Sequence, residues 1–152
     1  MNVIDFYESV DQQALIEKIE QGEWSAAKFL AKLLRQGTFQ QAVGGGTVYL
    51  LMDKEKIVSF VTLTQQDCVA DKTLYPWLGF FYTFPDYRGH RYGGALLDYA
   101  AKEAKRQGHK QVYLATDHVD LYEKYGFTYL ENRMDIYGED SRIYLKKWED
   151  IA

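Results

Sequence analysis

The chain of 152 residues is long enough for one domain, taken as residues 1–152, and short for two. Apolar residues make up 47% of it and charged residues 26%, so we expect a packed core rather than a disordered chain. The formal net charge of −4 argues against a general nucleic-acid binder, which needs excess lysine and arginine to replace the counterions of phosphate groups.

The numbers of cysteines and histidines and the hydropathy of the chain further limit the class of protein. The single cysteine, Cys68, excludes an intrachain disulfide and a zinc site built from cysteines, and we expect it to be a reduced packing residue. The three histidines lack the paired spacing of metal ligands, so no metal is expected. The sequence has no run of about 18 apolar residues, and it begins with acids where a signal peptide carries bases. We therefore expect a cytoplasmic protein with no membrane partner.

Residues 1–36 are predicted to be helical, because apolar side chains recur there three and four positions apart. The apolar positions are Leu15, Ile16, Ile19, Trp24, Ala27, Phe29, Leu30, Leu33 and Leu34. Gly37 is a typical stop signal for the second helical run. Three consecutive glycines at 44–46 then predict a flexible loop before the pattern changes.

The remainder of the chain is predicted to alternate strands with helices. Short apolar runs rich in β-branched and aromatic residues predict strands at 48–52, 57–63, 77–84, 111–115, 127–134 and 141–146, of which the first two form a hairpin. Residues 92–107 form the strongest predicted helix, with leucine and alanine on one face and charged residues on the other. A shorter helix is predicted at 120–124. This order predicts a mixed α/β fold.

The clearest chemistry lies where the strand at 77–84 ends and the helix at 92–107 begins. The connecting turn, residues 88–94, reads Arg-Gly-His-Arg-Tyr-Gly-Gly. The first N–H groups of a helix lack partners and carry partial positive charge, glycines let a phosphate approach them, and arginines add charge-assisted bonds. Neither the Walker A spacing nor the Rossmann spacing is present. The turn predicts a phosphate site or, more simply, a solvated turn with surface arginines.

Two segments in this region resemble the same family. The run 88–94 resembles the R-x-x-G-x-G/A pyrophosphate-binding motif of GNAT-type N-acetyltransferases. Residues 121–127, Leu-Tyr-Glu-Lys-Tyr-Gly-Phe, resemble that family's L-Y-E-K-x-G-F segment. The two lie in the family's order, separated by one helix and one strand. One position departs from the motif, because Arg91 stands where a glycine is usual.

The resemblance implies the GNAT fold, which is a central mixed and mostly antiparallel sheet with a splayed pair of parallel strands, flanked by helices. It also implies acetyl-CoA as co-substrate, held between the strands at 77–84 and 111–115. The cofactor-binding residues that it implies are Phe81, Tyr82, Thr83, Arg88, Gly89, His90, Arg91, Tyr92, Gly93 and Gly94. The acetyl group is expected to move directly to a primary amine, with the acetyl carbonyl polarised by a strand N–H.

The resemblance supplies a catalytic acid but no catalytic base. Tyr122 aligns with the family tyrosine that protonates the CoA sulfur, and a phenol with a reference pKa of about 10 keeps its proton at neutral pH. The structural alternative for Tyr122 is packing alone. His118 is the leading candidate for the base or for an acceptor contact, because histidine titrates near neutrality. Asp117, Asp67 and Asp71 are weaker candidates for the base.

Charge is unevenly distributed along the chain. Residues 1–23 hold six acids and one lysine, whereas residues 88–112 hold six bases and two acids. A basic region for CoA and an acidic region near the acceptor would suit a small cationic amine. Two alternatives stay open: a non-catalytic acyl-CoA-binding sensor on the same fold, and an acetyltransferase that acts on a protein or peptide. The resemblance also leaves a homodimer open.

Overall fold

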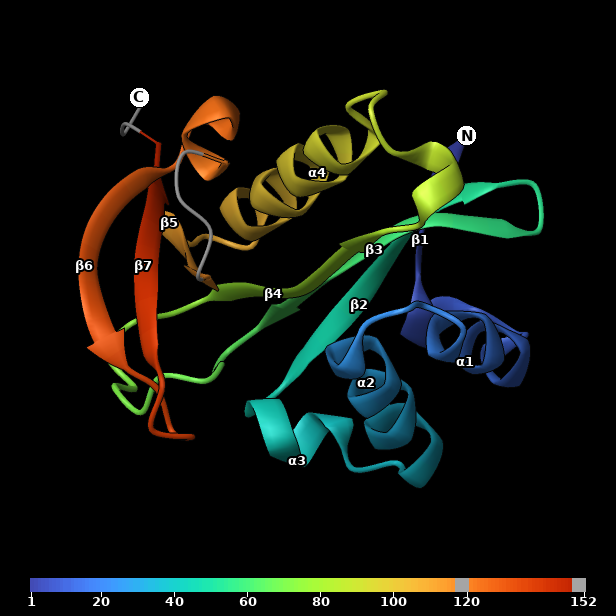
Figure 1. Cartoon of the computed structure of the whole chain (residues 1–152), viewed down its shortest axis with the longest axis horizontal. Coiled ribbons are helices and arrows are strands. Elements are labelled where there is room, and N and C mark those ends of the chain that lie inside the picture. Colours follow the sequence, from blue (N-terminus) through green and yellow to red (C-terminus); the bar gives the residue numbers. More distant parts are fainter. Residues whose placement is uncertain (117–120, 149–152) are drawn as a thin grey trace.

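The computed structural model describes residues 1–116 and 121–148. Within these residues seven strands form one sheet in the order β1-β2-β3-β4-β5-β7-β6 (Figure 1). The strands are β1 Asn2–Asp5, β2 Gly46–Asp53, β3 Lys56–Thr64, β4 Trp77–Thr83, β5 Gln111–Thr116, β6 Thr128–Met134 and β7 Asp140–Lys147. All neighbouring strands are antiparallel except β4 and β5, which are parallel. The predicted mixed, mostly antiparallel sheet is confirmed.

Helices cover both faces of this sheet (Figure 1). They are the 3-10 helices η1 Phe6–Glu8, η2 Pro85–Tyr87 and η3 Tyr122–Tyr125, and the α-helices α1 Gln12–Glu20, α2 Ser25–Gln36, α3 Phe39–Val43 and α4 Tyr92–Arg106. The helices α1, α2 and α3 share one hydrophobic cluster with Phe60 of β3, and α4 shares another with Val61. These consecutive residues point to opposite faces because side chains alternate along a strand. The sheet thus separates two hydrophobic layers.

One prediction for the N-terminal part was wrong, and a second is confirmed in part. Residues 1–36 are not helical throughout, because Asn2–Asp5 form β1, an edge strand that pairs with β2 from Asn2↔Met52 to Asp5↔Tyr49. A short edge strand is stabilised by a partner that is distant in sequence, so local spacing does not reveal it. The predicted loop at 44–46 is confirmed for Gly44 and Gly45, which form a turn after α3, whereas Gly46 already belongs to β2.

The predicted apolar stripe of α1 and α2 is confirmed for most of its members. The buried positions are Leu15, Ile16, Ile19, Ala27, Leu30, Leu33 and Leu34. Trp24 and Phe29 differ, since 37% and 44% of their surfaces stay exposed. The predicted stop is confirmed as well, because Gly37 takes a left-handed conformation at the end of α2.

The small side chains of α4 bring this helix close to the sheet. Its buried residues are Gly93, Leu96, Leu97, Ala100, Ala101 and Ala104. Alanine and glycine allow a short distance between helix and strands, while the charged side chains at Lys102 and Lys105 remain exposed. Because α4 follows β4 after a short turn, its N terminus lies next to the end of β4 (Figure 1).

Candidate active site

The parallel strands β4 and β5 separate after two paired positions. Their register holds only Trp77↔Tyr113 and Leu78↔Leu114, although β4 continues to Thr83. Beyond Leu78, the backbone edge of β4 that faces β5 has no paired strand in the part of the chain that the structure describes. An extended ligand with amide groups can occupy such an edge in place of a strand.

A bulge in β4 accompanies this separation. The register of β4 against β3 shifts so that two residues, Phe80 and Phe81, lie opposite Val61 alone. Phe80 has a φ of 47°, a left-handed conformation that is uncommon for an aromatic residue. A bulge bends its strand and increases the local twist. The bulge therefore explains why the second half of β4 turns away from β5.

The residues after the bulge point to both faces of the sheet. A Cβ atom on Gly93 of α4 would lie 2.7 Å from Phe81 Cζ and 2.8 Å from Thr83 Oγ1, so these two side chains face α4. Tyr82 faces the layer of α1 to α3, where its ring stacks on Trp24 with centroids 5.8 Å apart. Two of the three β4 residues expected to bind the cofactor thus point toward α4, and one points away from it.

Arg88 follows η2 and points back along β4. Its Nε donates to the carbonyl oxygen of Thr83 at 2.9 Å, and its guanidinium carbon lies 5.4 Å from the centroid of the Tyr82 ring. The residue is exposed and lines a cavity beside β4. A guanidinium carries five N–H donors, so the bond to Thr83 leaves donors for a ligand.

The N terminus of α4 presents unpaired backbone N–H groups. The Ala95 N–H donates to the carbonyl of Arg91, so the N–H groups of Tyr92, Gly93 and Gly94 precede this ladder of bonds. In the described structure, the side chain of the N-cap residue Arg91 accepts no hydrogen bond from these N–H groups. Such N–H groups carry the positive end of the helix dipole. The arrangement is suited to an anion, as the sequence predicted for this turn.

Arg91 adopts a left-handed backbone conformation, which glycine adopts more readily than any other residue. Its φ is 63°, in the left-handed region where a side chain costs energy and glycine costs little. Arginine is therefore accommodated at this position, and its backbone keeps the geometry of the turn.

This strain predicts a difference between two substitutions at Arg91. Both Arg91→Gly and Arg91→Ala remove the charged side chain, but only glycine relieves the left-handed strain. We expect the glycine variant to be more stable than the alanine variant by about 1 kcal/mol. Urea unfolding of the two variants measures this difference, and equal stabilities would contradict the assigned conformation.

The other turn residues lie around the same helix end. Gly89 has a φ of 83°, and the exposed His90 stacks on Tyr92 with centroids 5.4 Å apart. A Cβ atom on Gly94 would lie only 2.5 Å from Cε1 of Tyr125, so a side chain there would collide with that ring. Gly94 therefore lets η3 pack against the start of α4.

Tyr122 lies in η3, between β4 and the final strands, and only 6% of its surface is exposed. Its ring lies edge-on to Phe81, with centroids 6.3 Å apart, and also packs against Phe127 and Tyr144. Tyr122 and Phe81 line the same cavity. The two segments that resembled family motifs are thus brought to one site.

The cavity has a volume of about 700 Å³ and is lined by residues from several elements, including Arg88 and Tyr122. Its β4 and β5 residues are Leu78, Gly79, Phe80, Phe81, Tyr82, Leu114, Ala115 and Thr116. The other sides come from the α1–α2 region, the β3–β4 loop and the β6–β7 turn, which contribute Trp24, Asp67 and Tyr137 among others. Trp24 and Phe29 were expected in the core but line the cavity instead. Their position at the edge of the apolar stripe was the sequence feature that could have indicated this exposure.

Acidic side chains outnumber basic ones around this cavity. The carboxylates are Glu23, Asp67, Asp135 and Glu139, and Arg88 is the one basic side chain among the described lining residues. Glu23 and Glu139 are exposed, whereas Asp67 is half-buried. The α1–α2 turn is anchored beside the cavity, because the backbone N–H of Glu23 donates to the Tyr82 hydroxyl at 3.1 Å. The excess of carboxylates favours a cationic ligand.

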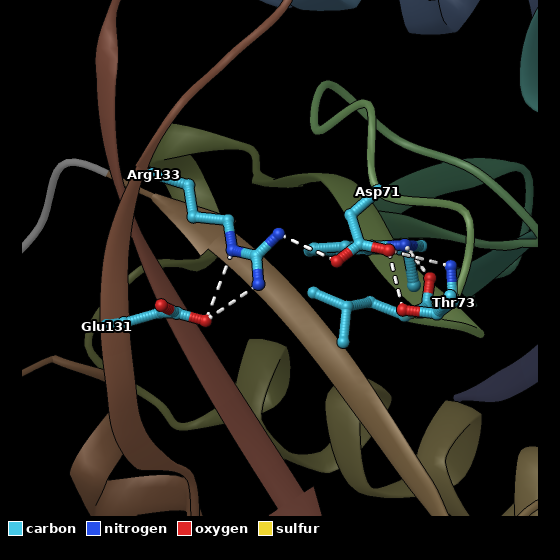
Figure 2. Close-up of polar contacts among 6 residues, drawn as sticks. Asp71, Thr73, Glu131 and Arg133 are labelled. Carbon is cyan, nitrogen blue, oxygen red and sulfur yellow. Dashed lines mark hydrogen bonds and ion pairs between the residues drawn. The ribbon is translucent and has the colours of Figure 1, made fainter.

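The structure separates the four candidates for the base. Asp67 lines the cavity, whereas His118 and Asp117 lie outside the described residues. Asp71 is engaged elsewhere (Figure 2): its carboxylate accepts bonds from the Thr73 backbone and hydroxyl and forms an ion pair with Arg133 at 2.7 Å. This network joins the β3–β4 loop to β6. Asp71 therefore acts as an anchor of the loop that carries Asp67.

The Asp71 network predicts a pH dependence of stability. Hydrogen bonds from Thr73 and the pair with Arg133 lower the pKa of Asp71 from 3.8 to about 2. A lowered folded-state pKa stabilises the fold above pH 3.8, and this contribution is lost as pH falls through about 2. The difference in unfolding free energy between wild type and Asp71→Asn should therefore be constant at neutral pH and vanish near pH 2. Urea unfolding at several pH values measures it, and a difference independent of pH would contradict the network.

Cys68 does not have the properties of a nucleophile. Burial and the neighbouring Asp67 carboxylate raise the pKa of its thiol to about 12. A thiol with this pKa is protonated at neutral pH, and the thiolate is the nucleophilic form. The expectation of a reduced packing residue is in line with its half-buried position beside Val69 and Trp77.

Two further findings concern metals and membranes. Among residues 1–116 and 121–148, no group of three histidine, cysteine or acidic side chains lies close enough to hold a metal ion. No helix within these ranges has the length and hydropathy needed to cross a bilayer.

Comparison with known proteins identifies the family. Residues 44–129 match the family described as acetyltransferase (GNAT) domain, which covers more than half of the chain. The chain belongs to the GNAT family. It is therefore an acetyltransferase by family, and the match includes β4, the turn before α4 and Tyr122. A search of curated protein sequences found no match to the chain.

Solved structures share this GNAT fold at low sequence identity. An aminoglycoside 6'-N-acetyltransferase complexed with coenzyme A is 15% identical, with a TM-score of 0.70 and 97% of each chain covered. A GNAT acetyltransferase from Elizabethkingia anophelis with acetyl-CoA bound is also 15% identical, with a TM-score of 0.69 and 97% of each chain covered. A ribosomal-protein-alanine N-acetyltransferase from Brucella melitensis is 14% identical, with a TM-score of 0.68 and coverage of 97% of this chain and 100% of that one.

Proposed function

We propose that this GNAT protein transfers an acetyl group from acetyl-CoA directly to a primary amine of a small acceptor. The observation that carries the proposal is the cavity, which reaches from the separated ends of β4 and β5 to Tyr122 and to an acidic rim. Family membership supplies the acetyltransferase chemistry. The fold neighbours with bound coenzyme A or acetyl-CoA support the choice of co-substrate.

The proposed cofactor site combines the free edge of β4 with the turn before α4. The amide groups of the pantetheine arm pair with the β4 backbone near Phe81 and Thr83, which is supported by the early end of the β4–β5 register. The pyrophosphate accepts bonds from N–H groups within residues 88–94, which is supported by the uncapped N terminus of α4. Arg88 and His90 add donors at the rim, and Gly89 supplies the turn.

The catalytic acid in this proposal is Tyr122. It donates its phenol proton to the CoA sulfur as the carbon–sulfur bond breaks, which makes the sulfur a better leaving group. Support comes from its place in the cavity, edge-on to Phe81. His118 stays a proposal from the sequence, as a base or as a contact to the acceptor.

The acceptor is proposed to be a small cationic amine. The cavity volume of about 700 Å³ falls in the usual range for small-molecule sites. Its carboxylates favour a protonated amine, and the ring of Trp24 offers an apolar surface with cation–π character. The fold neighbours include enzymes named for aminoglycosides and for a ribosomal protein, so the fold by itself does not select between small and protein acceptors.

The proposal also covers location and partners. We propose a cytoplasmic location without a membrane partner, and the acidic net charge argues against a nucleic-acid partner. A measurement of the protein's mass in solution tests whether it forms a homodimer.

Release of CoA thiol in the presence of amines tests the proposal. Polyamines, aminoglycosides, amino acids and peptides with a free N terminus form the panel, and thermal unfolding with acetyl-CoA is recorded in parallel. We expect acetyl-CoA to raise the melting temperature and a small cationic amine to stimulate thiol release. Binding of acetyl-CoA without amine-dependent release would favour a sensor. Release with peptides alone would favour a protein acetyltransferase.

A further inference from the structure

We infer that Asp67 is the general base that removes the proton from the acceptor amine. This inference rests on the proposed function, because it concerns the same cavity and the same reaction. At neutral pH a primary amine with a pKa of about 10 is an ammonium ion, so it must lose a proton before its nitrogen can attack. The cavity must therefore supply a proton acceptor near the acetyl group.

Asp67 lies against the bulge of β4. A Cβ atom on Gly79 would lie 2.6 Å from Asp67 Oδ1, so the carboxylate occupies the space that a side chain at Gly79 would fill. Gly79 is followed by Phe80 and Phe81, where β4 leaves β5 and its backbone edge becomes available. With its pyrophosphate at residues 88–94 and its amides near Thr83 and Phe81, the proposed co-substrate runs back along β4, so its acetyl end points toward Gly79 and Asp67.

A second oxygen atom borders the same space. Thr62 Oγ1 lies 3.2 Å from the Cβ position on Gly79 and is fully buried. Among the described residues this hydroxyl oxygen has no hydrogen-bond partner. A buried polar atom without a partner is costly. Thr62 does not line the cavity, so this hydroxyl belongs to the buried surroundings of Asp67 rather than to the surface that an acceptor meets.

The other carboxylates of the cavity are less suited to the role. Asp135 accepts bonds from the backbone N–H groups of Tyr137 and Glu139, at 2.9 Å each, and so holds the β6–β7 turn. Glu23 and Glu139 are exposed at the rim, where water stabilises their charged form. The titratable groups that line the cavity with Asp67 are Glu23, Cys68, Tyr82, Arg88, Tyr122, Asp135, Tyr137 and Glu139.

The surroundings of Asp67 make it a stronger base than an exposed aspartate. Burial raises the pKa of the carboxyl group above its ordinary value, and this effect exceeds the opposite effect of hydrogen bonds from the Cys68 backbone and thiol. A base works best when its pKa is close to the working pH. Cys68 cannot take the role itself, because a thiol with a pKa of about 12 retains its proton at neutral pH.

The resulting reaction balances in protons and electron pairs. The ammonium nitrogen gives one proton to an Asp67 oxygen, and its lone pair forms a bond to the acetyl carbonyl carbon. The carbon–sulfur bond then breaks, and the sulfur takes the proton of Tyr122. The attack moves one carbonyl electron pair onto oxygen, and the return of that pair expels the sulfur with the carbon–sulfur pair. The nitrogen gives its second proton to the Tyr122 phenolate and becomes an amide, and Asp67 releases its proton to water, so that one proton is released per turnover.

The test compares Asp67→Asn with wild type on two acceptors of the same shape. One is an amine with an ammonium pKa of about 10, and the other is its β,β-difluorinated analogue, in which the two fluorine atoms lower the ammonium pKa to about 7. We expect Asp67→Asn to lower kcat about 100-fold for the first amine, the lower end of the range for general-base catalysis, and much less for the fluorinated one. The acidic limb of the pH profile of kcat/KM should disappear with the first amine.

Three further variants separate the alternatives. Asp67→Glu keeps a carboxylate and should retain the acidic limb. Asp98→Asn removes a carboxylate from α4, where it pairs with Lys102 at 2.9 Å outside the cavity lining, and should retain both the limb and the ratio between the two amines. Retention of the thermal shift with acetyl-CoA shows that a variant is folded. Equal losses of Asp67→Asn on both amines, or an acidic limb that persists in Asp67→Asn and disappears in His118→Gln, would overturn the role of Asp67.

Failure of the proposed function gives a different result. If wild type itself releases no thiol with any amine, the acetyltransferase reaction is refuted, and the base with it. If wild type releases thiol and Asp67→Asn matches it on both amines, only the role of Asp67 is refuted.

Discussion

Replacement of Tyr122 by phenylalanine is expected to lower kcat by about 100-fold while the affinity for acetyl-CoA stays close to that of wild type. The change removes one oxygen and its proton from a ring that is otherwise held by Phe81, Phe127 and Tyr144. In this variant the enzyme donates no proton from this position to the CoA sulfur, so the sulfur is a poorer leaving group. Steady-state kinetics of thiol release, with acetyl-CoA affinity measured by calorimetry, separate the two effects.

Tyr125→Phe is the matched control for this experiment. Tyr125 lies in the same helix η3 and loses the same hydroxyl, but its ring packs on Gly94 at the start of α4. We expect its kcat to remain near the wild-type value. An unchanged kcat in Tyr122→Phe would limit Tyr122 to packing, and a parallel loss of acetyl-CoA affinity would assign its effect to binding.

Gly93→Val is expected to abolish the stabilisation of the protein by acetyl-CoA. A Cβ atom at this position would lie 2.7 Å from Phe81 Cζ and 2.8 Å from Thr83 Oγ1, so the larger side chain must push α4 away from β4. Overpacking of this kind costs about 1–3 kcal/mol of stability. It also moves the N–H groups of α4 away from the edge of β4, and the two halves of the proposed cofactor site no longer align.

The control for Gly93→Val is Ala95→Val. Ala95 lies two residues further along α4 and is exposed, so the same side chain meets solvent there. Thermal unfolding with and without acetyl-CoA is the measurement for both variants. The account would be contradicted by a Gly93→Val protein whose melting temperature rises with acetyl-CoA as much as that of wild type.

Much of the fold could be predicted from the sequence because most elements carry their own local signal. The hairpin of β2 and β3 and the amphipathic helix α4 are both confirmed with small changes at their ends. β1 was missed because its pairing partner in β2 lies more than forty residues away. The glycines at 44–46 indicated a turn, but the preceding five residues close into α3.

Only those parts of the site that consist of contiguous residues could be predicted from the sequence. The turn 88–94 and the segment 121–127 are such runs, and the structure brings Arg88 of the first and Tyr122 of the second to one cavity. The bulge at Phe80 could not be predicted, because a left-handed aromatic residue is a consequence of how β4 pairs with β3. The position of Asp67 over Gly79 depends in turn on that bulge and on the anchoring of the loop through Asp71 and Arg133 (Figure 2).

The proposed site binds acetyl-CoA between the separated ends of β4 and β5, with its pyrophosphate at the N terminus of α4. A crystal structure of the protein with CoA tests this placement. We expect a pantetheine arm paired with the backbone of β4 near Phe81 and Thr83, and phosphate oxygens within hydrogen-bond distance of N–H groups in residues 88–94. A pantetheine arm outside the gap between β4 and β5, or a pyrophosphate distant from the start of α4, would contradict it.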